Sequence, residues 1–324
     1  MAASTPVPGT REGPAPTSGP APAAAVPRSP AARARRRRRG LVGLLYAAPA
    51  AVVVGVLFVL PLLLAAWMSL NDWPLIGSAE FNAPANYVAI ADNELFLGSI
   101  GFTLKYTVVV TVIYFVVGLG LALLVQESRP GVGLFRTAFF LPAVVGLASA
   151  SLLFYALYNN EFGPVDDLLR AVGLTDGDVD FLGDPDNAFA STVVMVTWRF
   201  AGFNMLILLT GLQAIPTEVY EAARMDGASW WQTLRSVTLP LLRPTIALML
   251  ILTVTGSLLA FEPFYVLTAG GPGNSTVTMV MAMFREAFTL FDLGSSAALA
   301  VVLLVVLVAL NAVQFLVLRR DREA

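Results

Sequence analysis

The feature that most constrains this chain is a set of six long apolar stretches, each able to cross a lipid bilayer. A helix that spans the hydrocarbon core needs roughly 20 predominantly apolar residues. The stretches lie near residues 42–70, 101–126, 135–158, 189–213, 241–268 and 295–318. Of the 324 residues, 57% are hydrophobic and 13% are charged, a composition outside the range of ordinary soluble domains. The sequence therefore predicts an all-α integral membrane protein with six transmembrane helices.

The placement of charge predicts the orientation of these helices. Basic residues are enriched in cytoplasmic loops, so alternate loops should differ in their content of Arg and Lys. One set of loops and termini is basic and contains Arg33, Arg35 to Arg39, Arg129, Arg136, Arg224, Arg235, Arg243, Arg319, Arg320 and Arg322. The other set is acidic and contains Asp72, Glu80, Asp92, Glu94, Glu161, Asp166, Asp167, Asp176, Asp178, Asp180, Asp184 and Asp186. We expect both termini to be cytoplasmic.

The chain divides into a membrane domain and two tails. Residues 1–40 are rich in Pro and Ala and end in an Arg-rich run, so we expect a disordered cytoplasmic tail. A signal peptide is the alternative, but the apolar segment 41–70 is about twice as long as a signal-peptide core. We expect a retained helix there, a membrane domain over 41–320, and a short cytoplasmic tail at 321–324. Pro49, Pro61 and Pro263 predict kinked or tilted first and fifth helices.

The residues that are absent exclude several kinds of chemistry. There is no Cys and no His, which excludes disulfides, Cys/His metal sites and a Ser-His-Asp triad. The single lysine, Lys105, lies outside any Gly-rich loop, so the phosphate-binding sequence GxxxxGK[ST] cannot form. The charge pattern gives no reason to expect nucleic acid as a partner. We expect no enzymatic activity and no cofactor or metal in this chain.

Residues 215–244, between the fourth and fifth apolar stretches, predict two short helices joined by a turn. Pro216 should end the preceding helix, and Thr217 should cap the next one. Gly227 provides the backbone freedom for the turn. Ser229 and Gln232 have the spacing of a capping box that opens the second helix, which Pro240 should close or kink. By pattern alone, this segment could be an amphipathic hairpin that merely links two spans.

The residues of this segment carry a resemblance to a known family. They match the signature EAA, followed by DGA and LP, of permease subunits in binding-protein-dependent ABC importers. The matching residues are Glu221, Ala222, Ala223, Asp226, Gly227, Leu239, Pro240 and Pro244. The resemblance implies a cytoplasmic coupling helix that docks on an ATPase subunit. It identifies Glu221, Ala222, Ala223, Asp226 and Gly227 as the coupling residues.

Further motifs along residues 41–320 resemble the carbohydrate-uptake branch of this family, whose members include maltose and glycerol-phosphate permeases. These motifs are Asn71-Asp72-Trp73, Asn86-Tyr87, Leu134-Phe135-Arg136-Thr137 with Leu141-Pro142, Phe162-Gly163, and residues 267–276. The resemblance implies a multi-pass protein of the bacterial plasma (inner) membrane that imports a carbohydrate by alternating access. It also implies a second related permease subunit, two cytoplasmic ABC ATPases that bind ATP and Mg²⁺, and an extracytoplasmic sugar-binding protein.

Five residues within the apolar stretches are candidates for the substrate pathway. Ionisable residues in a membrane span usually mark a cavity or need a partner, and a sugar requires aromatic faces and polar groups. The candidates are Trp198, Arg199, Asn204, Glu262 and Tyr265. The alternative interpretation is an ion pair between Arg199 and Glu262, or snorkelling of either residue to an interface. The family often has Asp in place of Glu262, and Pro263 follows, so this sequence departs from the family pattern there.

Two other classes of protein are alternatives to an ABC permease. An ion-coupled secondary transporter commonly carries internal repeats and several buried titratable groups, and this sequence has no convincing repeat. A permease of the same family for a non-sugar solute remains an alternative. A membrane scaffold or receptor would need a soluble domain, which the sequence does not predict.

Two outer segments carry expectations of their own. We expect residues 270–273 to be a flexible outer turn, and the acidic segment 159–187 to be able to contact a docked binding protein.

Overall fold

The computed structural model describes residues 46–127, 129–175 and 179–320. The tails expected at 1–40 and 321–324 lie outside the described residues. The chain falls into two units, divided between Leu60 and Pro61. The first described helix, Tyr46–Met68, crosses this division.

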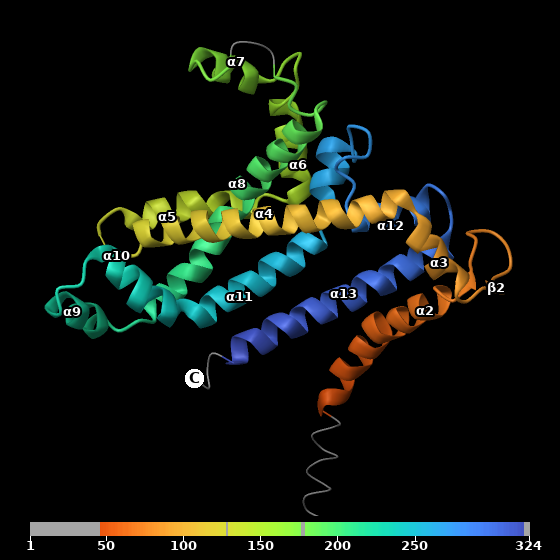
Figure 1. Cartoon of the computed structure of the whole chain (residues 1–324), viewed down its shortest axis with the longest axis horizontal. Coiled ribbons are helices and arrows are strands. Elements are labelled where there is room, and N and C mark those ends of the chain that lie inside the picture. Colours follow the sequence, from red (N-terminus) through yellow and green to blue (C-terminus); the bar gives the residue numbers. More distant parts are fainter. Residues whose placement is uncertain (1–45, 128, 176–178, 321–324) are drawn as a thin grey trace, which may run out of the picture. The chain divides into compact units, whose positions relative to one another are not determined.

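The described residues are almost entirely helical (Figure 1). The first helix contains η1 (Gly55–Val59) and α2 (Leu60–Met68), and a small hairpin of β1 (Asn71–Asp72) and β2 (Glu80–Phe81) follows it. The next elements are α3 (Ala85–Asp92), α4 (Glu94–Leu124), α5 (Val132–Phe140), η2 (Leu141–Val144), α6 (Leu147–Leu157), α7 (Pro164–Ala171) and α8 (Pro185–Gln213). The last are α9 (Thr217–Met225), α10 (Trp230–Thr233), η3 (Leu234–Thr238), α11 (Leu239–Leu258), η4 (Pro263–Thr268), α12 (Met279–Phe288) and α13 (Leu293–Arg320).

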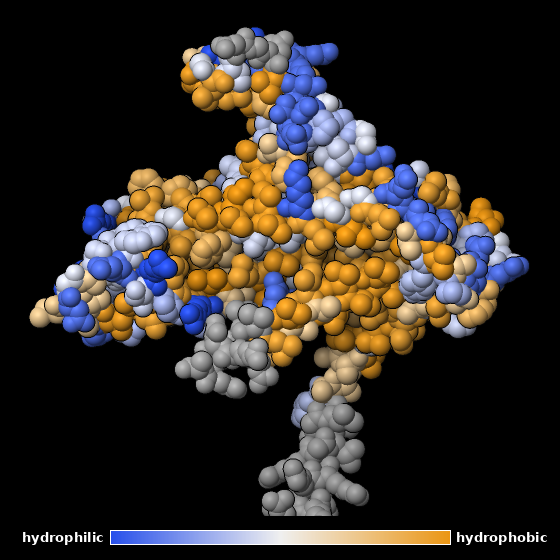
Figure 2. All heavy atoms as spheres, viewed as in Figure 1, coloured by the Kyte–Doolittle hydropathy of each residue, from blue (hydrophilic) through white to orange (hydrophobic). Residues whose placement is uncertain are grey.

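Within the described residues, five helices are long and apolar enough to span a membrane. They are Tyr46–Met68, Glu94–Leu124, Pro185–Gln213, Trp230–Thr268 and Leu293–Leu316. The pair Val132–Val144 and Leu147–Leu157 would make a sixth span, with a bend of 94°. Hydrophobic side chains cover the middle of the spanning helices, and hydrophilic side chains gather around α7, around α9 and α10, and near α3 (Figure 2). The protein is thus an all-helical membrane protein with five or six candidate spans.

The bend in the third apolar stretch was not predicted, because we expected a single helix over residues 135–158. Pro142 lies in the 3₁₀ turn η2, and Val145 and Gly146 then adopt extended backbone angles before α6 begins. Pro lacks the N–H that a continuing α-helix needs, so the helix ends close to it. The apolar composition of the stretch is that of one span, whereas its backbone is that of two helices.

Helices α4, α8 and α11 pack together and form most of the core of the second unit. The approach of α4 to α8 is close at Gly118, where an added Cβ would lie 3.1 Å from the Cβ of Asn204. The largest side chains that are fully enclosed include Met195, Met205 and Met249. Close packing of this kind supplies dispersion contacts between the helices. These contacts matter because lipid tails are as apolar as the side chains, so the hydrophobic effect does not drive the helices together.

Wide π-helical turns occur beside three of the prolines. The turn η1 ends two residues before Pro61, η3 ends two residues before Pro240, and η4 begins at Pro263. A wider turn accommodates a ring that has no N–H and would clash with the preceding turn. The expected distortions at Pro61 and Pro263 are therefore present, whereas Pro49 lies in regular α-helix.

Two of the motifs that carry the family resemblance meet in the structure. The buried amide of Asn86 donates hydrogen bonds to the backbone oxygens of Ser69 (3.0 Å) and Asn71 (2.9 Å). The hydroxyl of Tyr87 lies 2.8 Å from that of Ser69. An added Cβ on Gly294 would meet the backbone oxygen of Asn71, so α13 approaches this segment closely. These motifs join the β-hairpin to α3 and α13.

Arg136 caps the carboxyl end of α4. Its Nε and Nη2 atoms donate hydrogen bonds to the backbone oxygen of Val125, at 3.1 and 2.6 Å, and Nη2 also reaches that of Gln126 at 3.4 Å. The last carbonyl groups of a helix have no partner within the helix, and they carry partial negative charge that a guanidinium stabilises.

We expect Arg136→Ala to lower the free energy of unfolding by about 2 kcal/mol, because hydrogen bonds to a charged donor are lost. Arg136→Lys is the matched control, and it should lose less because the ammonium keeps the charge but not the planar fork. Thermal unfolding in detergent measures both effects. Equal stability of the wild type and Arg136→Ala would contradict this role.

Candidate functional site

Two parts of the structure are candidates for function, a helical hairpin after α8 and a cavity between the spans. In the hairpin, α9 and α10 are joined at Gly227, whose φ of +75° lies in the left-handed region. Ser229 and Gln232 form the expected capping box, in which the Ser229 N–H donates to Gln232 Oε1 at 2.8 Å. The predicted pair of short helices is therefore present.

Two details of the hairpin differ from the expectation. The residue at the cap position of α9 is Pro216, and Thr217 is the first helical residue, with no side-chain capping bond. Pro240 does not close the second helix, because the helix continues from α10 through η3 into α11. The wide turn η3 absorbs the proline, so the hairpin is joined directly to a spanning helix.

The residues of the EAA signature do not all face the same way. Glu221, Ala222, Asp226 and Gly227 are exposed, whereas Ala223 is only 8% exposed. Of the two alanines that the resemblance identifies as coupling residues, Ala222 is on the surface and Ala223 is buried within this chain. An exposed surface with two carboxylates and no large side chain at Ala222 suits close contact with a basic partner.

A hollow of about 770 Å³ adjoins the hairpin. Its lining includes Gln126, Glu127, Tyr220, Glu221, Arg224 and Thr233. These residues come from the segment just after α4, from α9 and from α10, so the hairpin and the chain that leaves a spanning helix share one polar surface. Helix α9 follows the carboxyl end of α8, and α7 precedes its amino end (Figure 1). The two short helices therefore lie at opposite ends of the same span.

The structure brings two of the five pathway candidates to one cavity. Asn204 and Glu262 line a cavity of about 140 Å³ between α4, α6, α8 and α11. Trp198 and Tyr265 do not line it: the Trp198 ring packs on Phe154 with 5.3 Å between centroids, and the Tyr265 ring stacks on Phe261 at 4.9 Å.

Arg199 also lies outside the lining of the cavity. Its guanidinium lies 4.9 Å from the centroid of the Phe200 ring, and its Nε is buried without a hydrogen-bond partner. Among the described ion pairs none joins Arg199 to Glu262, so the ion pair that we considered is not formed.

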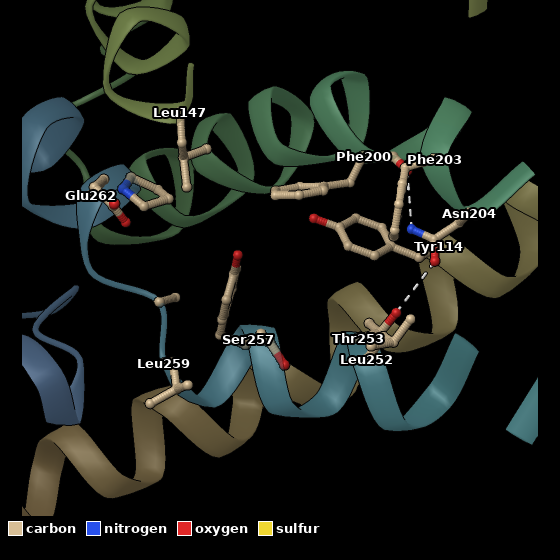
Figure 3. A pocket seen from close by; sticks show the side chains of 14 residues that line it. Tyr114, Leu147, Phe200, Phe203, Asn204, Leu252, Thr253, Ser257, Leu259 and Glu262 are labelled. Carbon is tan, nitrogen blue, oxygen red and sulfur yellow. Dashed lines mark hydrogen bonds between the residues drawn. The ribbon is translucent and has the colours of Figure 1, made fainter. Parts of the chain in front are cut away.

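The cavity has aromatic walls and polar ends. Figure 3 shows Glu262 at one end and Tyr114, Asn204 and Thr253 at the other. The Thr253 hydroxyl lies 3.4 Å from Asn204 Oδ1, and Asn204 Nδ2 donates to the backbone oxygen of Phe200 at 3.0 Å. Aromatic faces beside fixed polar groups are what a ligand with C–H faces and hydroxyls requires.

Several residues of the cavity were missed at the level of sequence. They are Tyr106, Tyr114, Phe200, Phe203, Thr253 and Ser257. A signal was available in the polar spacing, since Thr253 and Ser257 are four apart on α11 and therefore share a face. The two tyrosines are eight apart on α4, which also places them on one side of the helix.

The loop after η4 is held by a hydrogen-bond network. The hydroxyls of Thr268 and Thr276 lie 2.7 Å apart, and Thr276 also donates to the backbone oxygen of Gly271 at 2.7 Å. The guanidinium of Arg285 on α12 donates to Asn274 Oδ1 at 2.7 Å. We had expected a flexible turn at 270–273, whereas the structure closes this loop on itself and ties it to α12.

The fold of the described residues is that of an ABC-type membrane permease. A solved bacterial ABC transporter involved in the import of the acidic polysaccharide alginate has the same fold, with a TM-score of 0.77, 22% identity, and coverage of 89% of this chain and 98% of that one. A bacterial alginate ABC transporter in complex with an alginate-pentasaccharide-bound periplasmic protein matches with a TM-score of 0.73, also at 22% identity, covering 87% of this chain and 94% of that one.

The chain belongs to the family of binding-protein-dependent transport system inner membrane components, whose model matches residues 115–323. It is therefore a multi-pass inner-membrane permease subunit of an ABC importer, and such subunits lack an ATPase domain. The expected family is thus confirmed. Among the described residues there is no group of three or more acidic side chains that could hold a metal ion.

Curated relatives of known name are similar over most of their length. The trehalose/maltose permease MalF of Thermococcus litoralis is 32% identical, covering 88% of this chain and 96% of its own length. The sulfoquinovosyl glycerol permease SmoG and the sn-glycerol-3-phosphate permease UgpA, both of Agrobacterium fabrum, are each 33% identical. They cover 86% and 84% of this chain, and 91% and 92% of their own lengths. These relatives are named for both neutral and anionic solutes.

Proposed function

We propose that this chain carries a carbohydrate from an extracytoplasmic binding protein into the cytoplasm, driven by ATP hydrolysis on partner subunits. The observation that carries the proposal is the hairpin of α9 and α10, which presents Glu221, Ala222 and Asp226 on its surface and continues directly into a spanning helix. A movement imposed on the hairpin is transmitted along α11 to the cavity, because α11 lines it.

The hairpin extends beyond the bilayer on the cytoplasmic side in this proposal. The helix from Trp230 to Leu258 has 29 residues and is about 43 Å long, which exceeds the roughly 30 Å of a hydrocarbon core. The basic residues Arg224 and Arg235 flank the connection, which favours the cytoplasmic side. Both termini are then cytoplasmic, and α7 lies outside, where the binding protein arrives.

The assembly that we propose contains this chain, a second related permease and two cytoplasmic ATPases that bind ATP and Mg²⁺. Glu221 and Asp226 are the carboxylates that pair with basic residues of an ATPase, and Gly227 shapes the turn that fits its surface. When the ATPases close on ATP, the cavity changes from facing inward to facing outward. The names of the relatives support a sugar or a glycerol phosphate as the cargo.

The proposal is tested by uptake into proteoliposomes that contain the purified complex, with maltose, trehalose, lactose and glycerol 3-phosphate as separate radiolabelled probes. Uptake of at least one carbohydrate should require ATP on the ATPase side and the binding protein on the other. Uptake driven by an ion gradient without the ATPases would overturn it and would indicate a secondary transporter.

A further inference from the structure

We infer that the cavity lined by Glu262 admits neutral hydroxylated solutes and rejects anionic ones, and that Glu262 sets this selectivity. The inference rests on the proposed function, because it concerns which solutes the pathway accepts. Relatives of this chain are named both for uncharged sugars and for anionic solutes, so membership of the family does not decide between them. The decision has to come from the residues of the cavity itself.

Three of the hydroxyls that line the cavity have used their only hydrogen to bond with the protein, whereas no described hydrogen bond uses the hydrogen of the Tyr106 hydroxyl. The Tyr114 hydroxyl donates to a backbone oxygen of α8 at 3.2 Å, and the Ser257 hydroxyl donates to one within α11 at 3.1 Å. Thr253 donates to Asn204 at 3.4 Å. A hydroxyl that has donated its one hydrogen keeps only lone pairs for a ligand. Tyr114, Thr253 and Ser257 therefore present acceptors to the cavity, which suit a ligand that brings its own O–H donors.

The charge of the cavity also favours neutral solutes over anionic ones. Of the described residues that line it, Glu262 alone carries a formal charge, and a carboxylate only accepts hydrogen bonds. The hydroxyls of a sugar can donate to it. A carboxylate, phosphate or sulfonate on the solute would lack a donor there and would be repelled by the charge of Glu262 across a low-dielectric space.

The positive charge of Arg199 does not cancel the negative charge that Glu262 gives the cavity. It is absent from the lining, whereas Phe200, beside it in sequence, does line the cavity. The guanidinium of Arg199 lies against the Phe200 ring, with 4.9 Å to the ring centroid. Removing the positive charge of Arg199 should therefore change the choice between neutral and anionic solutes much less than removing the negative charge of Glu262.

The test uses two pairs of probes in which the members of each pair differ only at the exocyclic carbon 6, a hydroxymethyl group in one and a carboxylate in the other. They are methyl glucoside with methyl glucuronide, and methyl galactoside with methyl galacturonide. Binding to the complete detergent-solubilised complex, without the binding protein, is followed by saturation-transfer NMR. In the wild type, the neutral member of at least one pair should bind roughly tenfold more tightly than the anionic member, as expected for one unfavourable charge contact.

The variants then assign the selectivity. In Glu262→Gln the ratio of the two affinities should fall to within about twofold of unity, since the amide keeps the shape but not the charge. Arg199→Gln is the control and should change the ratio much less than Glu262→Gln does. Size-exclusion chromatography with the partner subunits checks that each variant assembles.

Three results would overturn the inference. They are equal or tighter binding of the anionic probes in the wild type, an unchanged ratio in Glu262→Gln, and no binding of any of the four probes. The proposed function fails separately, if the wild-type complex shows no ATP-dependent uptake of any carbohydrate. A complex that transports with ATP but shows no charge preference would retain the function and contradict only the charge selectivity.

Discussion

Replacement of Gly227 by proline should abolish ATP-driven uptake while leaving the complex assembled. Gly227 has a φ of +75°, and the proline ring fixes φ near −65°, so the turn between α9 and α10 cannot form as it is. No heavy atom lies within 4 Å of the position of an added Cβ, and the N–H that proline lacks donates only within the hairpin, to the backbone oxygen of Arg224 at 3.0 Å. The damage should therefore be confined to the shape of the hairpin.

Two further variants at this position separate backbone shape from side-chain size. Gly227→Asn should keep most of the uptake, because Asn tolerates the left-handed region, and Gly227→Ala should lie between Asn and Pro. Uptake and ATP hydrolysis in proteoliposomes measure the effect, and co-purification of the ATPases measures assembly. Normal uptake in Gly227→Pro would count against coupling through this hairpin.

A substitution at Gly202 should have the largest effect on stability. An ideal Cβ there would clash with the backbone oxygen of Phe139, so α5 and α8 touch through their backbones. Backbone atoms cannot move aside as the end of a flexible side chain can. We expect Gly202→Ala to lower the free energy of unfolding by about 3 kcal/mol, at the upper end for overpacking.

The matched control for this prediction is Gly120→Ala on α4. No heavy atom lies within 4 Å of a Cβ built on Gly120, and the residue is exposed. Its stability should equal or slightly exceed that of the wild type, because Ala is the better helix former. Thermal unfolding of both variants in the same detergent decides the matter. Equal stability of the two variants would contradict the prediction, because it would show that α5 can move away from the added methyl group without a loss of stability.

The spans were predictable because burial in lipid demands long apolar runs, and the hairpin was predictable because capping and turn residues act locally. Asn93 shows one limit: it caps α4, so the helix begins at Glu94, seven residues before the apolar stretch that we placed at 101–126. Polar residues at the edge of a span resemble a loop in sequence, although the backbone is already helical.

The bend within the third apolar stretch and the set of residues that line the cavity were less predictable from the sequence. The bend of 94° after Val144 follows from Pro142 and two extended residues, yet the composition of the stretch gives no angle. The cavity depends on which faces of several helices meet. For this reason Asn204 and Glu262 were found from their polarity, whereas Tyr114 was missed.

The proposed function depends above all on the hairpin of α9 and α10 lying on the cytoplasmic side of the membrane. The chain has no cysteine, so a single introduced thiol reports its own position without background. Met225, at the end of α9, is 88% exposed, and Leu174, which follows α7 at the other end of α8, is 71% exposed. Met225→Cys and Leu174→Cys therefore make a matched pair of reporters.

The decisive measurement is labelling of these two variants with a membrane-impermeant maleimide in right-side-out and inside-out vesicles. Our account predicts that Met225→Cys reacts only in inside-out vesicles and Leu174→Cys only in right-side-out vesicles. Reaction of Met225→Cys from the outer face would place the hairpin away from any cytoplasmic ATPase and would contradict the account.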